Sequence, residues 1–503
     1  MPVTTGVPHR STFRVTFAVL IIATIPFTIL QSAVTPVLAT IQDEMHTSQS
    51  TVTWVMTAYL LTASIATPIL GRLGDIMGRK RVLVAVLAVL ACGTLLAALA
   101  SSIEVLLAAR AIQGIGGAIL PLAFGIIRDE FPTEKVAGGI SALAAILAAG
   151  LGLGTVVAGP IVSWMSYHFL FWIPLTVIVL SVFAVAVLVP ASKDPGGGRI
   201  SVLPAVSLAA LLSALLLAVS KGSQWRWSSP TVVVLLVVGV LLVPLWLLSE
   251  ARADHPLVDV AMMRRRAVWA TNVVALLFGV GMYSVFVFLP AFVQTPRAAG
   301  YGFGASVSES GLFLLPLTAA MFATGLLSTS LTNRCGAKVV VVNGSALTAA
   351  SCALLVVAHD DRWAIFAFSA AVGAGLGFVF AAMANLIVDA VPASQVGVAS
   401  GMNANIRTIG GAVGTATTAT LVTANAMTDG TPVEAGYVHG FVFLCGSAVL
   451  ATLVAFAIPA TRRASRQVTG DEDQGGRPRG IVIHGQDSLI AGAPLVERAA
   501  AED

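Results

Sequence analysis

The stretch from Gly71 to Arg81 reads GRLGDIMGRKR and lies between two long apolar runs. It packs four cations, one anion and three glycines into a short loop. Glycines allow a tight turn and close helix approach, and Asp75 can pair with an arginine or face a helix N-terminus, where a negative charge is favoured. A basic loop that served only to orient the chain in a membrane would need neither the glycines nor the aspartate. We therefore expect these contacts to hold helix ends together in one state and to release them in another.

Apolar runs continue on both sides of this loop along almost the whole chain. Of 503 residues, 57% are hydrophobic and 10% are charged, and the mean hydropathy is +0.91. This composition indicates an integral membrane protein and excludes soluble enzymes, nucleic-acid-binding modules and secreted disulfide scaffolds. Runs near the ~20 residues that cross a bilayer predict fourteen membrane spans, at 14–40, 51–70, 82–100, 104–127, 137–161, 168–189, 201–220, 230–249, 268–293, 308–331, 338–358, 363–388, 398–424 and 438–459.

The sequence lacks the patterns that enzymes and metal sites require. The four cysteines are scattered without a CxxC pair, and the seven histidines form no HExxH. There is also no GxSxG nucleophile motif and no GxxxxGK[ST] phosphate loop. We therefore expect no enzyme activity, no metal and no cofactor.

Basic residues show how the chain is oriented, because they are retained on the cytoplasmic side of a membrane. With both ends inside, the inside loops and ends hold 22 Lys and Arg. The outside loops hold four, namely Lys221, Arg226, Arg297 and Arg362. This asymmetry predicts a multi-pass protein of the plasma or inner membrane with both termini in the cytoplasm. It also explains the pI of about 9.0 without a nucleic-acid partner.

The second half of the chain repeats features of the first half about 260 residues later. Adding 260 to the positions of three residues in the fourth span, Gly117, Asp129 and Pro132, gives Gly377, Asp389 and Pro392. The loop Gly71–Lys80 has a decayed copy at Thr329–Lys338, TSLTNRCGAK, in which Asn333 replaces Asp75. A chance match of small residues in Gly-rich helices is the alternative. Repeated helical halves indicate a transporter whose site lies between them near the midplane.

With these residues in view, the chain resembles the major facilitator superfamily, whose loop between spans 2 and 3 carries a signature much like GRLGDIMGRKR. TWVMTAYLL (Thr53–Leu61) and LLAARAIQGIGGAILP (Leu106–Pro121) resemble the second and fourth spans of its drug:proton antiporters. Fourteen spans rather than twelve are typical of its subgroup of multidrug and antiseptic exporters, which has two extra central helices.

The resemblance implies a domain organisation. We expect an all-α integral membrane protein with two six-helix bundles, at 1–190 and 267–460. Linkers and two inserted transmembrane helices occupy 191–266, and the Gly run in ASKDPGGGRIS reads as a flexible linker. The polar segment 461–503 is expected to be a disordered cytoplasmic tail.

The resemblance also implies a role for the signature loop. In this family, the loop aspartate and an acid at the end of span 4 form a charge cluster with loop arginines that stabilises the outward-facing state. The implied cytoplasmic latch consists of Gly71, Arg72, Gly74, Asp75, Gly78, Arg79, Lys80 and Asp129.

The fifth span matches less well. Exporters of this type have a Gly-rich fifth helix that ends in Gly-Pro and is followed by a further Gly pair. Here Gly150, Gly154 and Gly159-Pro160 are present, but a serine and a tryptophan stand where the pair is expected. Spacing of four residues puts Gly150 and Gly154 on one face, which permits close helix packing. Ordinary packing of small residues accounts for the pattern equally well.

Two arginines fall inside predicted spans. Arg110 lies six residues after Glu104 in span 4, roughly 9 Å deeper at 1.5 Å per residue. A cation at depth costs at least ~2.5 kcal/mol and is rare unless it faces a cavity or a partner. Gln113, one turn on, lies on the same face, whereas snorkelling to the surface is the alternative. Arg407 is flanked by amides in NANIRTIGG and is equally consistent with a position near the inner surface.

No acid lies at the middle of a predicted span. Many fourteen-span exporters carry an Asp in span 1 for proton or cation handling, yet Leu30 and Gln31 occupy that place here. If protons drive the cycle, an acid at a span end must carry them, with Glu309, Glu104 and Asp129 as candidates in that order. Together with Arg110, they are the candidates for coupling.

The lack of central carboxylates also bears on the substrate. A cavity that is positive on balance favours neutral, amphipathic or anionic compounds. An aromatic residue in a span is by itself more often core or lipid-facing. The candidates for the substrate cavity are Gln31, Trp54, Tyr59, Gln113, Asn272, Tyr283, Phe286, Asn403 and Arg407.

These observations predict a secondary active transporter that exports lipophilic or amphipathic small molecules by alternating access, driven by proton antiport. Its partners are the small-molecule substrate, protons and the lipid bilayer, and it is expected to be a monomer. The alternative is a facilitator that imports or exports a metabolite or lipid without proton coupling.

Overall fold

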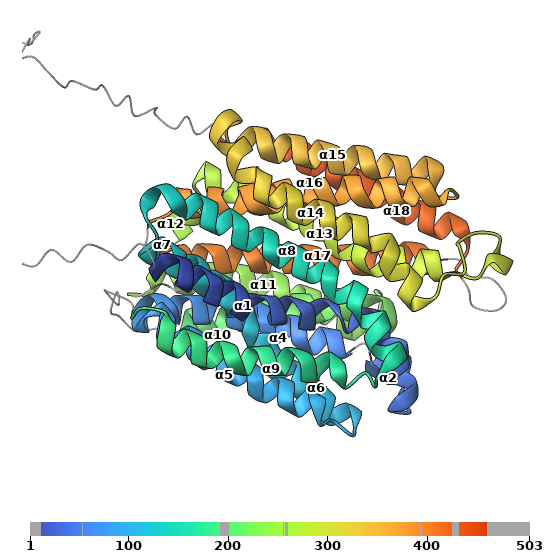
Figure 1. Cartoon of the computed structure of the whole chain (residues 1–503), viewed down its shortest axis with the longest axis horizontal. Helices are drawn as coiled ribbons and strands as arrows, with labels where there is room; N and C mark the ends of the chain where they lie inside the picture. The colour runs from blue at the N-terminus through green and yellow to red at the C-terminus, as the bar shows by residue number, and fades with distance from the viewer. Residues whose placement is uncertain are drawn as a thin grey trace, which may run out of the picture. The chain divides into compact units, whose positions relative to one another are not determined.

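The computed structural model describes residues 12–52, 54–191, 201–254, 256, 260–392, 395–424 and 432–459. The elements in these ranges are helices (Figure 1). The long ones are α1 (Thr12–Ser32), α4 (Trp54–Met77), α5 (Arg79–Ala98), α6 (Ile103–Gly114), α7 (Ile119–Glu130), α8 (Thr133–Trp164), α9 (Phe169–Leu188), α10 (Val202–Trp225), α11 (Pro230–Arg252), α13 (Arg266–Gln294), α14 (Val307–Cys335), α15 (Ala337–Ala358), α16 (Arg362–Ala390), α17 (Val396–Thr423) and α18 (Glu434–Ala455). The short ones are η1 (Thr35–Val37), α2 (Leu38–Glu44), α3 (Gln49–Val52), η2 (Ile115–Ala118), α12 (Val260–Met263) and η3 (Arg297–Ala299).

Each of the fourteen predicted spans corresponds to a helix, because α6, η2 and α7 together form the fourth one. Among the described residues, thirteen helices are long and apolar enough to cross a membrane. The helix that falls short is α17, which carries Asn403, Asn405, Arg407 and many threonines. The predicted all-α membrane fold is confirmed.

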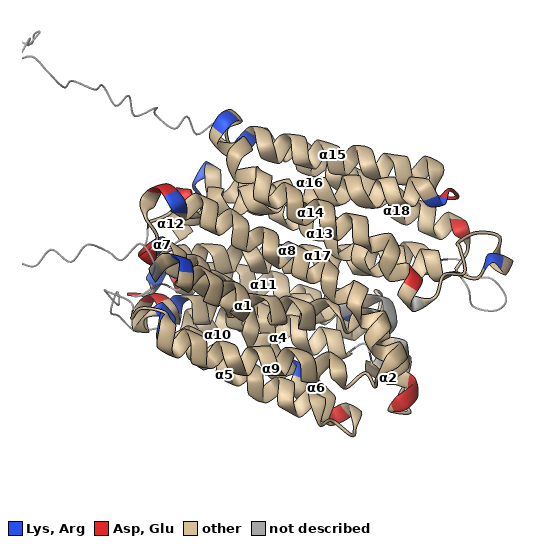
Figure 2. Ribbon diagram, in the orientation of Figure 1, with Lys and Arg blue, Asp and Glu red and all other residues tan. Residues whose placement is uncertain are grey.

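The outer surface of the described helices suits a bilayer. In α9 and α11, Phe183, Val187 and Leu241 are 65%, 78% and 64% exposed. A soluble protein rarely exposes a continuous apolar surface of this kind. Among the described residues, Lys and Arg gather mainly at one end of the helices, which we call the basic end (Figure 2). The turn between α4 and α5 lies there.

The internal repeat is visible in matching elements. Helices α4 to α9 correspond in order and length to α14 to α18, with α6–η2–α7 matching α16. Gly78 begins α5 with φ +98°, and Gly336 begins α15 with φ +88°. L-residues with side chains rarely adopt such angles, so both glycines are required by the same turn. These turns are 258 residues apart, as the sequence predicts.

Two details of the predicted spans are wrong. The first span does not run unbroken from 14 to 40: α1 ends at Ser32, and η1 and α2 follow. The break coincides with Pro36, which lacks the N–H needed to continue the helix. Lys221 does not lie in an outer loop either, because α10 continues to Trp225. Its side chain is fully buried and its ammonium lies 4.4 Å from the centre of the Trp54 ring, a favourable cation–π contact.

The halves meet along two seams. In one seam α8 packs against α14, and in the other α4 packs against α17. Helix α10 packs against both α4 and α17, and its Leu208, Leu212 and Leu216 share a hydrophobic cluster with Val398 and Met402 of α17. The inserted pair therefore covers the α4–α17 seam, with α11 on its outer side. The predicted linker ASKDPGGGRIS spans 191–201, and its residues 192–200 lie outside the described residues, as does the predicted tail at 461–503.

Candidate functional site

The signature loop forms a charge cluster at the basic end. Arg79, at the start of α5, donates from Nη2 to Asp75 Oδ1 at 2.7 Å and from Nη1 to Asp129 at 2.6 Å. Its Nη1 also donates to the Gly125 carbonyl at 3.2 Å. Asp75 and Arg79 are only 8% and 6% exposed. One guanidinium thus joins three helices, α4, α5 and α7, and we call Asp75, Arg79 and Asp129 the latch.

Glycines make room for the latch. A Cβ on Gly125 would collide with the Arg79 guanidinium, and a Cβ on Gly74 would collide with Leu122. Gly78 supplies the left-handed turn that starts α5, while Gly71 is buried in α4. Sequence reasoning missed Gly125. Its position four residues before Asp129, one helical turn away, could have indicated it.

The other predicted latch residues lie nearby without joining the ion pairs that the structure shows. Arg72 is partly buried in α4, and its Nε is buried without a hydrogen-bond partner among the described residues. Lys80 is partly exposed in the first turn of α5.

The second half carries different residues at the positions that match the latch. The repeat places Asn333 at the position of Asp75, Ala337 at that of Arg79 and Asn385 at that of Gly125. Asn385 instead reaches the first half, where its Nδ2 donates to Ser141 Oγ of α8 at 2.5 Å. The position that matches Gly125 thus contributes a contact between the halves rather than one within its own half.

A second contact joins the halves at the basic end. Arg128 of α7 donates from Nη1 to the Val388 carbonyl of α16 at 2.5 Å. These positions are 260 residues apart, so each is the repeat counterpart of the other. Together with Ser141 and Asn385, this contact closes the basic end of the two halves against each other.

A cavity lies between the halves, away from the basic end, and we call it the central cavity. Its free volume in this structure is about 50 Å³, less than the roughly 300–1,000 Å³ of a typical small-molecule site. Its lining residues are Phe27, Thr28, Gln31, Tyr59, Leu60, Ala63, Thr67, Gly117, Leu120, Leu147, Leu151, Tyr283, Phe380, Ala404, Asn405, Arg407 and Thr408. Two pairs of repeat counterparts, Leu120 with Phe380 and Leu147 with Arg407, line it together. The repeat thus builds one wall from each half.

Polar groups in the central cavity fall into two kinds. Some are paired: Gln31 Nε2 donates to Tyr283 Oη at 2.9 Å, and Asn405 Nδ2 donates to the Ser64 carbonyl at 2.5 Å. By contrast, Tyr59 Oη and Arg407 Nε are buried and have no hydrogen-bond partner among the described residues. The Arg407 guanidinium lies 4.6 Å from the centre of the Phe380 ring.

A smaller cavity adjoins the central one. It is lined by Leu120, Phe124, Phe380, Ala384, Ile387, Ser400, Asn403 and Arg407. Arg407, Phe380 and Leu120 border both cavities. Arg407 therefore stands at the junction of the two spaces.

Arg110 has a different environment from Arg407. It is fully buried, and its guanidinium donates to the Leu30 carbonyl at 3.1 Å, the Val55 carbonyl at 3.2 Å and Gln113 Oε1 at 2.8 Å. It also lies 4.4 Å from the centre of the Tyr59 ring. Gln113 does not line the central cavity, since it lies behind this network and contacts Thr94. Arg110 and Gln113 thus hold α1, α4, α5 and α6 together.

The remaining cavity candidates lie elsewhere. Trp54 packs against Lys221 and Trp225 of α10. Asn403 Nδ2 donates to Asn272 Oδ1 at 2.9 Å, and Asn272 lines a shallow pocket with Met263 and Trp269. Phe286 packs partly buried against the hydrophobic core. Of the nine candidates, the described central cavity brings together four, namely Gln31, Tyr59, Tyr283 and Arg407.

The acids predicted as proton carriers lie at helix ends. Glu309 Oε2 accepts the Ser306 N–H at 2.8 Å, while Ser306 Oγ accepts the Glu309 N–H at 3.2 Å. This reciprocal pair is a capping box. Glu104 lies exposed in the first turn of α6. Both carboxylates thus stabilise helix N-termini, whereas Asp129 belongs to the latch.

The glycines of α8 pack against two neighbours. A Cβ on Gly150 or Gly154 would collide with Thr28 or Ser32 of α1. A Cβ on Gly159 would approach Ser308 of α14 to 3.0 Å, and Pro160 lies inside α8. The Gly-rich helix therefore sits tightly both within its own half and along the seam.

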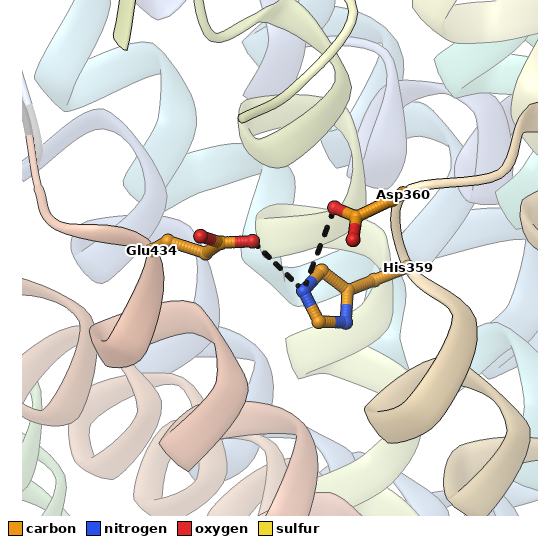
Figure 3. A group of neighbouring side chains, drawn as sticks. All are labelled: His359, Asp360 and Glu434. Atoms are coloured by element: carbon orange, nitrogen blue, oxygen red, sulfur yellow. Dashed lines mark hydrogen bonds and ion pairs between the residues drawn. The ribbon is translucent and has the colours of Figure 1, made fainter. Parts of the chain in front are cut away.

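Sequence reasoning also missed a cluster of His359, Asp360 and Glu434 (Figure 3). His359 Nε2 lies 3.0 Å from Glu434 Oε1 and 3.7 Å from Asp360 Oδ1. His359 Nδ1 lies 3.2 Å from the Val356 carbonyl, which can only accept. The ring of His359 thus lies between the end of α15 and Glu434. The residues are 75 apart in sequence, too far for a local pattern to show.

Two repeated helical halves with a cavity between them define this chain as a membrane transporter. The family model of the Major Facilitator Superfamily matches residues 20–415, with a further match over 296–498. The chain belongs to the major facilitator superfamily. Its members are multi-pass membrane transporters of small molecules and not enzymes.

Several relatives are transporters of bacteria. The multidrug transporter protein MdtP of Bacillus subtilis is 27% identical over 369 residues, covering 73% of this chain and 67% of that protein. The tetracenomycin C resistance and export protein of Streptomyces glaucescens is 28% identical over 380 residues, covering 75% and 70%. The uncharacterized MFS-type transporter Rv1877 of Mycobacterium tuberculosis is 28% identical over 396 residues, which cover 77% of this chain but only 56% of that protein.

A solved structure shows the same fold. The crystal structure of the human organic anion transporter MFSD10 (TETRAN) matches with a TM-score of 0.64 at 15% identity. The match covers 89% of this chain and 100% of that chain.

Proposed function

We propose that this protein exports lipophilic or amphipathic small molecules, as a monomer, by alternating access. The observation that carries the proposal is the central cavity, which is walled by both halves and lined mainly by apolar and aromatic residues. The names of two relatives, a multidrug transporter and an antibiotic resistance and export protein, support export of such compounds. The contacts at the basic end correspond to one closed gate of the cycle.

We further propose that the basic end faces the cytoplasm of a cell membrane. The positive-inside rule supports this orientation, because the Lys and Arg of the described residues gather mainly at that end (Figure 2). Because the cytoplasmic gate is closed, we propose that the structure represents the state that releases substrate. It is not the state in which substrate enters the protein from the cytoplasm.

Proton antiport is the proposed energy source, and the latch is the proposed coupling element. Arg79 pairs with both Asp75 and Asp129, and Arg72 and Arg128 add positive charge nearby. Asp75 Oδ2 is buried without a hydrogen-bond partner among the described residues. A proton on Asp75 would remove its ion pair with Arg79 and loosen α4 from α5 and α7. We therefore propose the latch, and not the capping acids Glu309 and Glu104, as the site that couples protons to transport.

The test is resistance profiling in cells that lack their own pumps. Expression of the chain should raise tolerance to lipophilic compounds in a chemically diverse panel, and a proton uncoupler should abolish the gain. Asp75→Asn, expressed at the same level as the wild type, serves as the inactive control. Unchanged tolerance to every compound would contradict export, while tolerance that survives the uncoupler would contradict proton coupling alone.

The alternative is a facilitator that moves a metabolite or lipid without proton coupling. The covered α4–α17 seam and the lack of a carboxylate in the described central cavity are compatible with it. Uptake or release that follows the substrate gradient alone, in vesicles without a proton gradient, would favour this alternative.

A further inference from the structure

The two arginines inside the helices differ in how their charge is satisfied. Arg110 donates to two backbone carbonyls and to Gln113. Arg407 has a buried Nε without a hydrogen-bond partner among the described residues, and it borders both cavities. A cation at membrane depth is costly unless it has a partner. Arg407 therefore has one buried donor, Nε, whose acceptor is missing among the described residues.

The cavities supply no such partner. Neither the central cavity nor the adjoining one has an aspartate or glutamate among its described lining residues. The face of the Phe380 ring lies 4.6 Å from the Arg407 guanidinium and offsets part of its positive charge. It is not a negatively charged hydrogen-bond acceptor. A ligand that carries a negative charge would supply what the protein lacks.

A second donor points to the same ligand chemistry. Tyr59 is fully buried and lines the central cavity, and its hydroxyl has no hydrogen-bond partner among the described residues. Arg110 behind its ring adds positive charge at 4.4 Å. A phenol hydroxyl and a guanidinium suit the oxygens of a carboxylate, sulfonate or phosphate group, because hydrogen bonds to ionised acceptors are the strong ones.

The rest of the cavity suits an apolar body. Phe27, Leu147, Leu151 and Phe380 line it, and Gln31 and Tyr283 are already bonded to each other. We propose that the central cavity binds amphipathic organic anions, with Arg407 and Tyr59 holding the anionic group and the aromatic and aliphatic wall holding the hydrophobic body. This inference rests on the proposed export function and narrows it from lipophilic compounds to amphipathic anions.

Binding to the purified full-length protein tests the proposal with matched ligands. Three aryl sulfonates and the corresponding neutral aryl sulfonamides share a body and differ in charge at pH 7. Wild type should bind each sulfonate more tightly than its sulfonamide. Arg407→Gln should weaken sulfonate binding by about 10- to 100-fold, the value of one charge-assisted hydrogen bond, and should change sulfonamide binding by less than about twofold.

Controls separate a binding role from a structural one. Arg334→Gln removes an exposed cation at the end of α14 and should leave both affinities unchanged, whereas Arg407→Lys should keep the preference for the anion. Equal loss of both ligands in Arg407→Gln, or equal wild-type affinity for sulfonate and sulfonamide in all three pairs, would overturn the proposal. Because binding is measured apart from transport, selective anion binding without resistance in cells would contradict export and leave the anion site standing.

Discussion

At the scale of single residues, the guanidinium of Arg79 connects three helices. It bonds Asp75 on α4 and Asp129 on α7 from the first residue of α5. The arrangement depends on Gly125, since any side chain there would occupy the space of the guanidinium. Breaking a buried ion pair by removing one partner leaves a buried charge uncompensated, which is costly. The latch is therefore sensitive to conservative changes.

We predict that Asp75→Asn abolishes export while the protein stays in the membrane. The amide keeps the shape of the carboxylate but loses the ion pair with Arg79. Resistance and membrane abundance measured on the same cells check this. Wild-type resistance in the Asp75 variant would refute the latch.

Gly125→Ala should lower transport by at least about tenfold, the effect of displacing one charge-assisted hydrogen bond. The added Cβ would meet the Arg79 side chain. Gly446→Ala in α18 is the control, since its Cβ would meet nothing within 4 Å; it should be neutral or stabilising by about 0.5–1 kcal/mol. Transport assays in vesicles distinguish the two, and equal activity would show that Arg79 does not need this space.

At the scale of helices, polar residues set where elements begin and break. Pro36 ends the first span early, and the capping box of Ser306 and Glu309 starts α14. The cluster of His359 and Glu434 ties the α15–α16 turn to the start of α18 (Figure 3). The charge or backbone geometry at these positions stabilises the ends of helices. An acid at a helix start is therefore weak evidence for a role in transport.

Glu309→Gln should leave the pH dependence of transport unchanged, because its carboxylate is engaged in the cap. Ser306→Ala should destabilise the start of α14 by about 1 kcal/mol and lower the thermal unfolding temperature of the purified protein. Transport by Glu309→Gln measured across a pH series checks the first of these predictions. A flattened pH profile would instead identify Glu309 as the proton carrier.

At the scale of the whole molecule, the described helices form repeated halves that meet along two seams. The α8–α14 seam is tight, with Gly152 against Thr318 and Gly159 against Ser308, and α10 covers the α4–α17 seam. Alternating access moves such halves as rigid bodies around a fixed site. The contacts at the basic end must then open while contacts within each half persist.

Cross-linking tests this motion. In a variant without Cys92, Cys335, Cys352 and Cys445, all of them free thiols, we introduce Ser141→Cys and Asn385→Cys, whose side chains touch across the halves. A short bifunctional thiol reagent should stop transport. The control pair, Ser284→Cys with Thr418→Cys, replaces side chains 3.4 Å apart within the second half and should stay active when cross-linked. Transport by the cross-linked first pair would contradict opening at the basic end.

Much of the fold was predictable from sequence because it depends on local properties. Apolar length predicts spans, and the shared 260-residue interval predicts matching halves. The fourteen helices and the paired turns at Gly78 and Gly336 agree with these expectations. Two details were misjudged. The break at Pro36 has a local cause, because proline lacks the N–H that continues a helix. The extension of α10 places Lys221 against Trp54, a contact that hydropathy does not show.

The site was less predictable. Arg110 and Arg407 look alike in sequence as cations inside apolar runs. Only the tertiary structure gives Arg110 three hydrogen-bond acceptors from α1, α4 and α6 and leaves Arg407 at the junction of two cavities. Likewise, Gln113 and Trp54 fit a cavity by residue type but face other helices. Which face of a helix meets the partner half depends on packing between distant segments.

The sequence by itself predicted an all-α membrane fold with fourteen spans, repeated halves and the loop Gly71–Arg81 between two helices. These properties follow from hydropathy, spacing and loop charge, which are read along the chain. The tertiary structure decided which charges are paired: Arg79 with Asp75 and Asp129, Arg110 with backbone carbonyls, and Arg407 with an aromatic face. Pairing depends on distances between segments brought together only by folding, because electrostatic and hydrogen-bond energies fall off within a few ångströms.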